Sequence, residues 1–190
     1  MVEILEEPSV RSLAIPISVA VYHRMGEEGL VDRKTELIRG VIIEKMSKSP
    51  LHSYLTGMLH RLVSAFVGDT GIVRREDPLT LTDSEPEPDV AVVEGTDLDY
   101  LTHHPTTARL VMEVCVTSER LDQQKADLYA EAGVEEYWIV MGHRRIIEVY
   151  RLPVAGHYQE PRVYRIGEAL KSSALPGLVI DLAALFPGKR

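Results

Sequence analysis

Apolar residues recur every three or four positions in three stretches of the chain, which is the spacing of one face of an α-helix. The clearest stretch follows Ser49 and Pro50, which suit the cap and the first turn of a helix. Its apolar positions are Leu51, Leu55, Met58, Leu62 and Phe66. We therefore predict an amphipathic helix that begins after Ser49 and packs on this stripe.

Two other stretches, residues 16–29 and 118–133, predict shorter helices. Each begins at a serine that can cap the first turn and ends at a glycine that can adopt a left-handed conformation. These pairs are Ser18 with Gly29 and Ser118 with Gly133.

Five runs are short, rich in β-branched residues and bounded by Gly, Pro or Asp, which is typical of strands. They are residues 71–83, 89–95, 108–117, 135–142 and 145–152. Two further apolar runs flank Arg39 and Gly40 within residues 35–46, and this arrangement predicts a tight hairpin.

The order of these elements predicts the topology. The helix of residues 118–133 connects two nearly continuous apolar strands, so these strands should be parallel and joined by a right-handed crossover. Residues 145–152 follow a short loop and should extend the sheet in the antiparallel sense. The tail, residues 172–190, is expected to close the domain with a short strand and a helical turn. The predicted fold class is α/β, with a mixed β-sheet flanked by helices.

Composition and length describe an ordinary globular chain. Its 190 residues are 45% hydrophobic and 26% charged, and no clear linker divides them. No apolar run approaches the roughly 20 residues that cross a bilayer, and the acidic start lacks the pattern of a secretory signal. We expect a cytoplasmic protein without a membrane partner, with residues 1–16 as an extension and residues 17–190 as one domain. The single cysteine, Cys115, lies in an apolar run and should be buried.

The formal charge of −8 argues against broad, charge-driven binding to phosphates. Basic residues still cluster locally along the chain. The clusters are Arg33, Lys34, Arg39, Lys45 and Lys48; Arg74 and Arg75; and His143, Arg144 and Arg145. We interpret them as solvated residues of loops and edges.

Lys125 is the most informative conflict in the pattern. It falls four residues after Leu121 and four before Tyr129, on the apolar face of the predicted helix. An ammonium group there must reach solvent, lose its proton or meet a carboxylate. Glu113, inside the preceding apolar strand, and Asp89, at the start of another, are equally awkward.

These three residues make sense together if Asp89 and Glu113 share a divalent cation at one end of the sheet and Lys125 reaches the same point. Two carboxylates suit Mg²⁺ or Mn²⁺, which retain several waters and accept phosphate oxygens. An alternative stays open, in which Glu113 and Lys125 form a semi-buried ion pair and Asp89 caps a turn after Pro88.

Several segments carry a resemblance to a known family. "PDV" at Pro88, Glu113 in an apolar strand 24 residues after Asp89, and the lysine further on resemble the PD-(D/E)XK nuclease superfamily. More closely, the sequence resembles a family described as "putative restriction endonuclease", first catalogued as a domain of unknown function. The resemblance extends from about Ile17 to Phe186 and rests on "ELIRGVI", "SPLHSYL", "EPDVAVV", "LVMEVCVTSERLDQQKADLYAEAGVEEYWIV" and "LPGLVIDL".

The resemblance implies a restriction-endonuclease-like core and Mg²⁺-dependent hydrolysis of phosphodiesters in DNA, with Mn²⁺ as a possible substitute. It implies that Asp89 and Glu113 are metal ligands, that Lys125 is a catalytic cation, that Glu36 is an additional acid and that His52 is a polar neighbour. A nuclease that cuts both strands of a duplex is expected to form a homodimer.

Two features depart from the superfamily pattern. Cys115 stands two residues after Glu113, where the pattern has lysine, so the lysine's role would have moved to the following helix. The acidic balance of the chain is the second departure. Both leave room for an alternative function, a catalytically inactive nuclease-fold domain that acts as a binding or interaction module.

Overall fold

The computed structural model describes residues 7, 9, 13–32, 34–45, 47–116, 119–186 and 188. The chain forms two compact units, one of residues 1–45 and 82–86 and the other of residues 46–81 and 87–190. Across the described residues, no helix combines the length and the apolar character needed to cross a membrane. The predicted division into an extension and one domain stays a prediction.

Among its described residues, the smaller unit has a helix and a hairpin that were both predicted from the sequence. The elements are α2 (Val19–Glu27), β1 (Thr35–Ile38) and β2 (Val41–Glu44). Ser18 caps α2 by accepting a hydrogen bond from Val21 N. The turn between β1 and β2 has positive φ at both central residues, 51° at Arg39 and 72° at Gly40. This is the turn that matches the twist of a two-residue hairpin.

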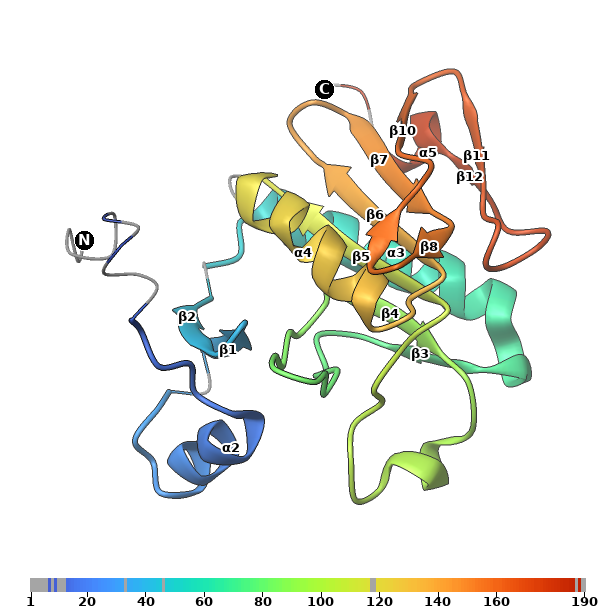
Figure 1. Ribbon diagram of the computed structural model, residues 1–190. Helices are drawn as coiled ribbons and strands as arrows, with labels where there is room; N and C mark the ends of the chain where they lie inside the picture. Colours follow the sequence, from blue (N-terminus) through green and yellow to red (C-terminus); the bar gives the residue numbers. More distant parts are fainter. Residues whose placement is uncertain are drawn as a thin grey trace. The chain divides into compact units, whose positions relative to one another are not determined.

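The larger unit is built on a six-stranded sheet with the order β10-β7-β6-β5-β4-β3 (Figure 1). Its strands are β3 (Ile72–Arg74), β4 (Val90–Val93), β5 (Leu110–Cys115), β6 (Glu136–Met141), β7 (Ile146–Arg151) and β10 (Arg162–Arg165). β5 and β6 are parallel and every other pair is antiparallel, so the predicted mixed sheet and crossover are confirmed.

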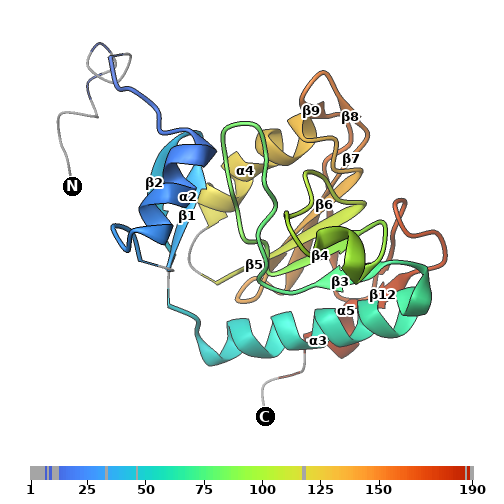
Figure 2. The same ribbon diagram turned by 90° about the horizontal axis from the view of Figure 1, so that it is seen from below.

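Two long helices cover opposite faces of this sheet, α3 (Pro50–Val67) and α4 (Glu119–Glu131), as Figure 2 shows. The faces follow from the alternation of side chains along each strand. Met112 and Trp138 join the buried cluster under α3, whereas Tyr137 packs against Tyr129 of α4, with ring centroids 4.9 Å apart. Cys115 is buried, as predicted.

Short elements complete the unit. They are η2 (Gly68–Thr70), η3 (Asp97–Tyr100), β8 (Pro153–Val154), β9 (His157–Tyr158), β11 (Ala169–Lys171), β12 (Val179–Asp181) and α5 (Leu182–Leu185). The strand and helical turn predicted for the tail are therefore present as β12 and α5. The pairs β8–β9 and β11–β12, and the edge strand β10, were not predicted. These strands are two to four residues long, too short for a period of two to be recognised.

Two sequence expectations need correction. Helix α3 packs through Leu55, Leu59, Val63 and Val67, whereas Leu62 and Phe66 of the predicted stripe are exposed. The helix is apolar on more than one side, so its spacing alone did not select the buried face. The strand expected over residues 71–83 ends at Arg74, because Glu76 takes a left-handed φ of 58° and Pro78 follows. The caps predicted at Ser49 and Gly133 are confirmed, and Ser118 lies outside the described residues.

A buried carboxylate ties the C-terminal segment to the sheet. Glu136, at the start of β6, is fully buried and accepts hydrogen bonds from Arg151 Nε at 2.8 Å and from Ser172 Oγ at 2.6 Å. The backbone N–H groups of Ser173 and Ala174 donate to it at 2.9 and 3.0 Å. We call Glu136 and its four donors, from Arg151, Ser172, Ser173 and Ala174, the Glu136 latch.

Candidate active site

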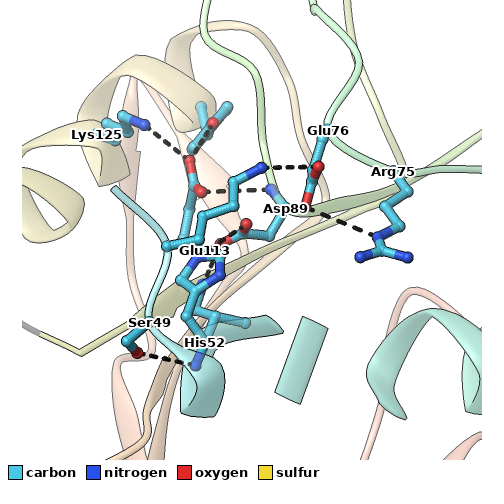
Figure 3. A network of polar contacts seen from close by, with 10 residues as sticks. Ser49, His52, Arg75, Glu76, Asp89, Glu113 and Lys125 are labelled. Atoms are coloured by element: carbon cyan, nitrogen blue, oxygen red, sulfur yellow. Dashed lines mark hydrogen bonds and ion pairs between the residues drawn. The ribbon is translucent and has the colours of Figure 1, made fainter. Parts of the chain in front are cut away.

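The sheet register brings two carboxylates together. Because β4 and β5 are antiparallel and Val90 pairs with Met112, Asp89 lies opposite Glu113. Val114 N donates to Asp89 Oδ2 at 2.7 Å, and Asp89 N approaches Glu113 Oε2 at 3.4 Å. Asp89 is 7% exposed and Glu113 is 5% exposed, so both acids are nearly buried at the same point (Figure 3).

Helix α4 supplies two donors to the same carboxylate. Lys125 Nζ lies 2.9 Å from Glu113 Oε1, and Lys125 is only 4% exposed. One helical turn further on, the Tyr129 hydroxyl donates to the same oxygen, also at 2.9 Å. The lysine therefore meets a carboxylate rather than reaching solvent. This ion pair belongs both to the predicted site and to the alternative in which the pair is only structural.

Helix α3 contributes His52 from its first turn, which begins after the cap residue Ser49. His52 Nε2 lies 3.1 Å from Asp89 Oδ1 and 3.2 Å from Asp89 Oδ2. The carboxylate of Asp89 thus lies beside the first turn of α3. Within the described part of the chain, the buried His52 Nδ1 has no hydrogen-bond partner. A neutral ring that donates from Nε2 would carry its lone pair on Nδ1.

The pKa of Tyr137, which packs against Tyr129, is raised by its surroundings. Burial raises the pKa of Tyr137 well above its usual value, and the charges of Glu113 and Asp122 add to the effect. Its hydroxyl therefore stays protonated and donates to the backbone oxygen of Asp122 at 2.9 Å. This hydrogen bond and the ring contact with Tyr129 hold the Tyr137 side chain against α4.

The donor set fits a hard divalent cation. Two nearly buried carboxylates are accompanied by one buried ammonium group, which leaves one negative charge in excess among these three groups. Mg²⁺ needs only one or two protein carboxylates, since it keeps several of its waters. Among the described residues, no group of three or more His, Cys, Asp or Glu side chains has an arrangement that would hold a metal ion. Asp89 and Glu113 supply the number of carboxylates that Mg²⁺ needs from a protein, and water can complete its coordination.

Of the predicted site residues, the structure brings together Asp89, Glu113, Lys125 and His52. Glu36 lies in β1 of the smaller unit, where it is largely buried and pairs in register with Ile43. Its participation stays a prediction.

Sequence reasoning missed the contributions of Tyr129, Lys48, Arg75 and Glu76. Tyr129 was assigned only to the apolar stripe, although its position four residues after Lys125 placed a hydroxyl on the same face. Lys48 and Arg75 were interpreted as solvated, and both side chains are exposed, but each also contacts Glu76. Lys48 Nζ lies 2.7 Å from Glu76 Oε2, and Arg75 Nε lies 3.7 Å from Glu76 Oε1. Glu76 is beside Asp89 in Figure 3, and its backbone N–H donates to the oxygen of Pro88.

Comparisons with known proteins show the fold and the family of the chain. A crystal structure from Anabaena variabilis, described as "a putative nuclease belonging to DUF820", superposes with a TM-score of 0.77 at 18% identity, covering 90% of this chain and 98% of that one. At this identity the likeness shows the fold alone, and it confirms the predicted mixed α/β architecture. No curated protein matches the chain significantly. The family Uma2, described as "Putative restriction endonuclease", matches residues 21–183, so the chain belongs to the Uma2 family.

Proposed function

We propose that the protein is a metal-dependent endonuclease that hydrolyses phosphodiester bonds in DNA. The observation that carries the proposal is the nearly buried pair of Asp89 and Glu113, set opposite each other on adjacent strands with Lys125 at the same point. Membership of the Uma2 family supports it. Two nearly buried acids with one lysine between the strands and α4, paired to Glu113, stabilise a fold poorly, because removing charges from water is costly. A divalent cation would compensate the negative charge of the two acids and could bind an anionic substrate.

Each residue has a distinct part in this proposal. Asp89 and Glu113 would hold Mg²⁺, or Mn²⁺ in its place, and the ion would supply Lewis-acid stabilisation of phosphate oxygens. Lys125 would stabilise the negative charge that develops on the phosphate. His52, through its contact with Asp89, would hold this ligand in one orientation, as partners of metal ligands do. Glu36 would be an additional acidic member of the site.

The direct test incubates the purified protein with plasmid and linear DNA in the presence of Mg²⁺, Mn²⁺ or a chelator. We expect cleavage with either metal and none with the chelator. Asp89→Asn, which keeps the shape and removes the charge, should abolish cleavage. Arg162→Gln, on the edge strand β10, is the control and should cleave like the wild type. Cleavage that persists in the chelator, or in folded Asp89→Asn, contradicts the proposal.

A second candidate function is a binding or interaction module without catalysis. One observation in its favour is that Glu113 Oε1 already accepts from both Lys125 and Tyr129, as an acid in a purely structural role would. The net charge of −8 favours it as well. Metal titration separates the two functions, because an inactive domain needs no Mg²⁺ at Asp89 and Glu113. Saturable binding of Mn²⁺ that is lost in Asp89→Asn would exclude the inactive module in its simplest form.

We also propose that the nuclease works as a homodimer. Two copies of the site related by a two-fold axis can reach both strands of a duplex, and closed dimers are the commonest oligomers. Light scattering at micromolar concentration is expected to give twice the chain mass of 21.3 kDa. A mass of one chain, with or without duplex DNA, would contradict self-association.

A further inference from the structure

Glu76 is held in an unusual conformation next to the carboxylate pair. Its φ of 58° lies in the left-handed region, which non-glycine residues rarely occupy and which is found preferentially at functional sites. Its backbone N–H donates to the oxygen of Pro88 at 3.1 Å, and Pro88 directly precedes Asp89. This hydrogen bond ties the backbone of Glu76 to the residue before Asp89, just ahead of β4.

The Glu76 carboxylate holds two basic side chains from different segments. Lys48 Nζ lies 2.7 Å from Oε2, and Arg75 Nε lies 3.7 Å from Oε1. Lys48 directly precedes Ser49, the cap of the helix whose first turn supplies His52. Figure 3 shows Glu76 and Arg75 to one side of Asp89 and Lys125 to the other. Lys48, Arg75 and Glu76 thus form a rim beside the carboxylate pair, and we refer to them as the cationic rim.

Both cations keep donors for another anion. Their side chains are 45% and 44% exposed, and the described residues offer neither of them a partner besides Glu76. An ammonium group has three N–H donors and a guanidinium group has five. The Arg75 contact, at 3.7 Å, is too long for a hydrogen bond, so Glu76 orients this side chain without occupying its donors.

The local charge also differs from that of the whole chain. Lys48, Arg75 and Lys125 balance the three carboxylates of Glu76, Asp89 and Glu113, apart from His52. A divalent cation at Asp89 and Glu113 would make this region positive by two charges, in a chain whose formal charge is −8. A phosphate chain would then be attracted to this region in spite of the acidic balance of the whole chain.

We propose that Lys48 and Arg75 bind a backbone phosphate of the DNA strand, next to the phosphate at Asp89 and Glu113. The inference rests on the proposed nuclease function and names how its substrate is held. Glu76 is a positioning residue that keeps the two cations at the rim when no DNA is bound. Contacts of this kind fix the position of the strand and carry no sequence preference of their own.

The test measures binding of a fluorescent duplex by anisotropy over a series of salt concentrations. Ca²⁺ replaces Mg²⁺, because it occupies oxygen sites with looser geometry. Lys48→Gln and Arg75→Gln are compared with the wild type. Arg162→Gln is the matched control, since Arg162 is also an exposed arginine paired with one glutamate, Glu168.

Each rim variant should lower affinity about three- to tenfold at about 0.1 M salt and should reduce the slope of log K against log salt by about 0.9. Arg162→Gln should match the wild type in both quantities. In the absence of DNA, the rim variants should bind Mn²⁺ at least as tightly as the wild type, because a repelling cation has been removed. Thermal midpoints should not change, which distinguishes lost binding from lost folding.

The failures of the two proposals look different. If the wild type cleaves DNA and the rim variants bind like Arg162→Gln, the rim is wrong and the nuclease stands. If Arg162→Gln weakens binding as much as the rim variants do, the effect is one of general charge and the rim is again wrong. A wild type that neither binds nor cleaves DNA overturns the proposed function and the rim together.

Discussion

Glu113 and Glu136 are buried glutamates on adjacent parallel strands of one sheet, and their surroundings differ in kind. Glu136 points to the α3 face and accepts hydrogen bonds from one guanidinium, one hydroxyl and two backbone N–H groups, all within 3.0 Å. Glu113 points to the α4 face, where Oε1 accepts two short bonds from side chains and Oε2 receives a 3.4 Å approach from Asp89 N.

The difference in hydrogen bonding distinguishes an acid that stabilises the fold from one proposed to act in the site. A carboxylate has about four acceptor positions, and the four bonds to Glu136 fill them. Its charge is compensated by Arg151, and the arrangement joins β6 to the C-terminal segment without needing any ligand. Glu113 pairs with Lys125, and a second nearly buried acid, Asp89, lies opposite it and contacts His52. We therefore assign the saturated Glu136 to the fold, and the proposed cation binding to the pair of Glu113 and Asp89.

The largest expected effect comes from Glu136→Gln. Removing the charge leaves Arg151 without its ion-pair partner, while its bonds to the Tyr164 hydroxyl and the Lys171 oxygen remain, and it weakens the bonds from Ser172, Ser173 and Ala174. Breaking a buried ion pair in this way should lower the free energy of unfolding by about 3 to 5 kcal/mol. Urea denaturation measures this loss, and DNA cleavage per folded molecule should be unchanged. A stable variant with reduced cleavage would show that the two glutamates do not differ as argued.

Lys125→Met tests the other side of the comparison and should have the next largest effect. Methionine keeps the length and apolar body of lysine at a buried position, so the fold should survive. Cleavage should fall by about 10² to 10³-fold, the range observed when one electrostatic stabiliser is removed. If Glu113 and Lys125 form only a structural pair, the result reverses. The variant would lose about 3 to 5 kcal/mol and cleave normally when folded.

Tyr129→Phe should have a smaller effect that sharpens the comparison. It removes one donor to Glu113 Oε1 while keeping the ring that packs on Tyr137. Loss of a partner that orients a metal ligand should weaken Mn²⁺ binding by about 10- to 100-fold, as measured by titration. Tyr150→Phe is the control, because that hydroxyl bonds to Glu148 rather than to the site. Equal Mn²⁺ affinity in the two variants would leave Tyr129 with a role in packing alone.

The sequence predicted those features that depend on short stretches of chain. The parallel β5–β6 pair follows from two continuous apolar strands joined by one helix, and Lys125 was visible because an ammonium interrupts an apolar stripe. Glu113 was visible for the same reason. A charged residue inside an apolar run can be recognised from its immediate neighbours in the sequence, so both conflicts could be found without the structure.

Features that depend on packing between distant segments could not be predicted in the same way. His52 meets Asp89 because α3 crosses under the sheet, and no spacing in the sequence encodes a contact between residues 52 and 89. The left-handed conformation of Glu76, which orients the cationic rim, has no sequence signal because it occurs in a residue that rarely adopts it. Ser172 donates to Glu136 from a segment whose strands, β11 and β12, are only three residues long, too short to be recognised in the sequence.

The Glu136 latch has a further consequence for the response of the fold to acid. Burial alone would raise the pKa of Glu136, but the hydrogen bonds from Ser172, Ala174 and Arg151 outweigh it and lower the pKa below its usual value of 4.5. The folded state therefore binds this proton less tightly than the unfolded chain does. The contribution of the latch to stability is complete above the unfolded pKa and is lost as the pH falls through the folded value. The difference in stability between the wild type and Glu136→Gln should narrow below about pH 4.5, measured by denaturation at successive pH values, and a constant difference would contradict the linkage. Acid should therefore loosen the attachment of the C-terminal segment to β6 by protonating this one carboxylate.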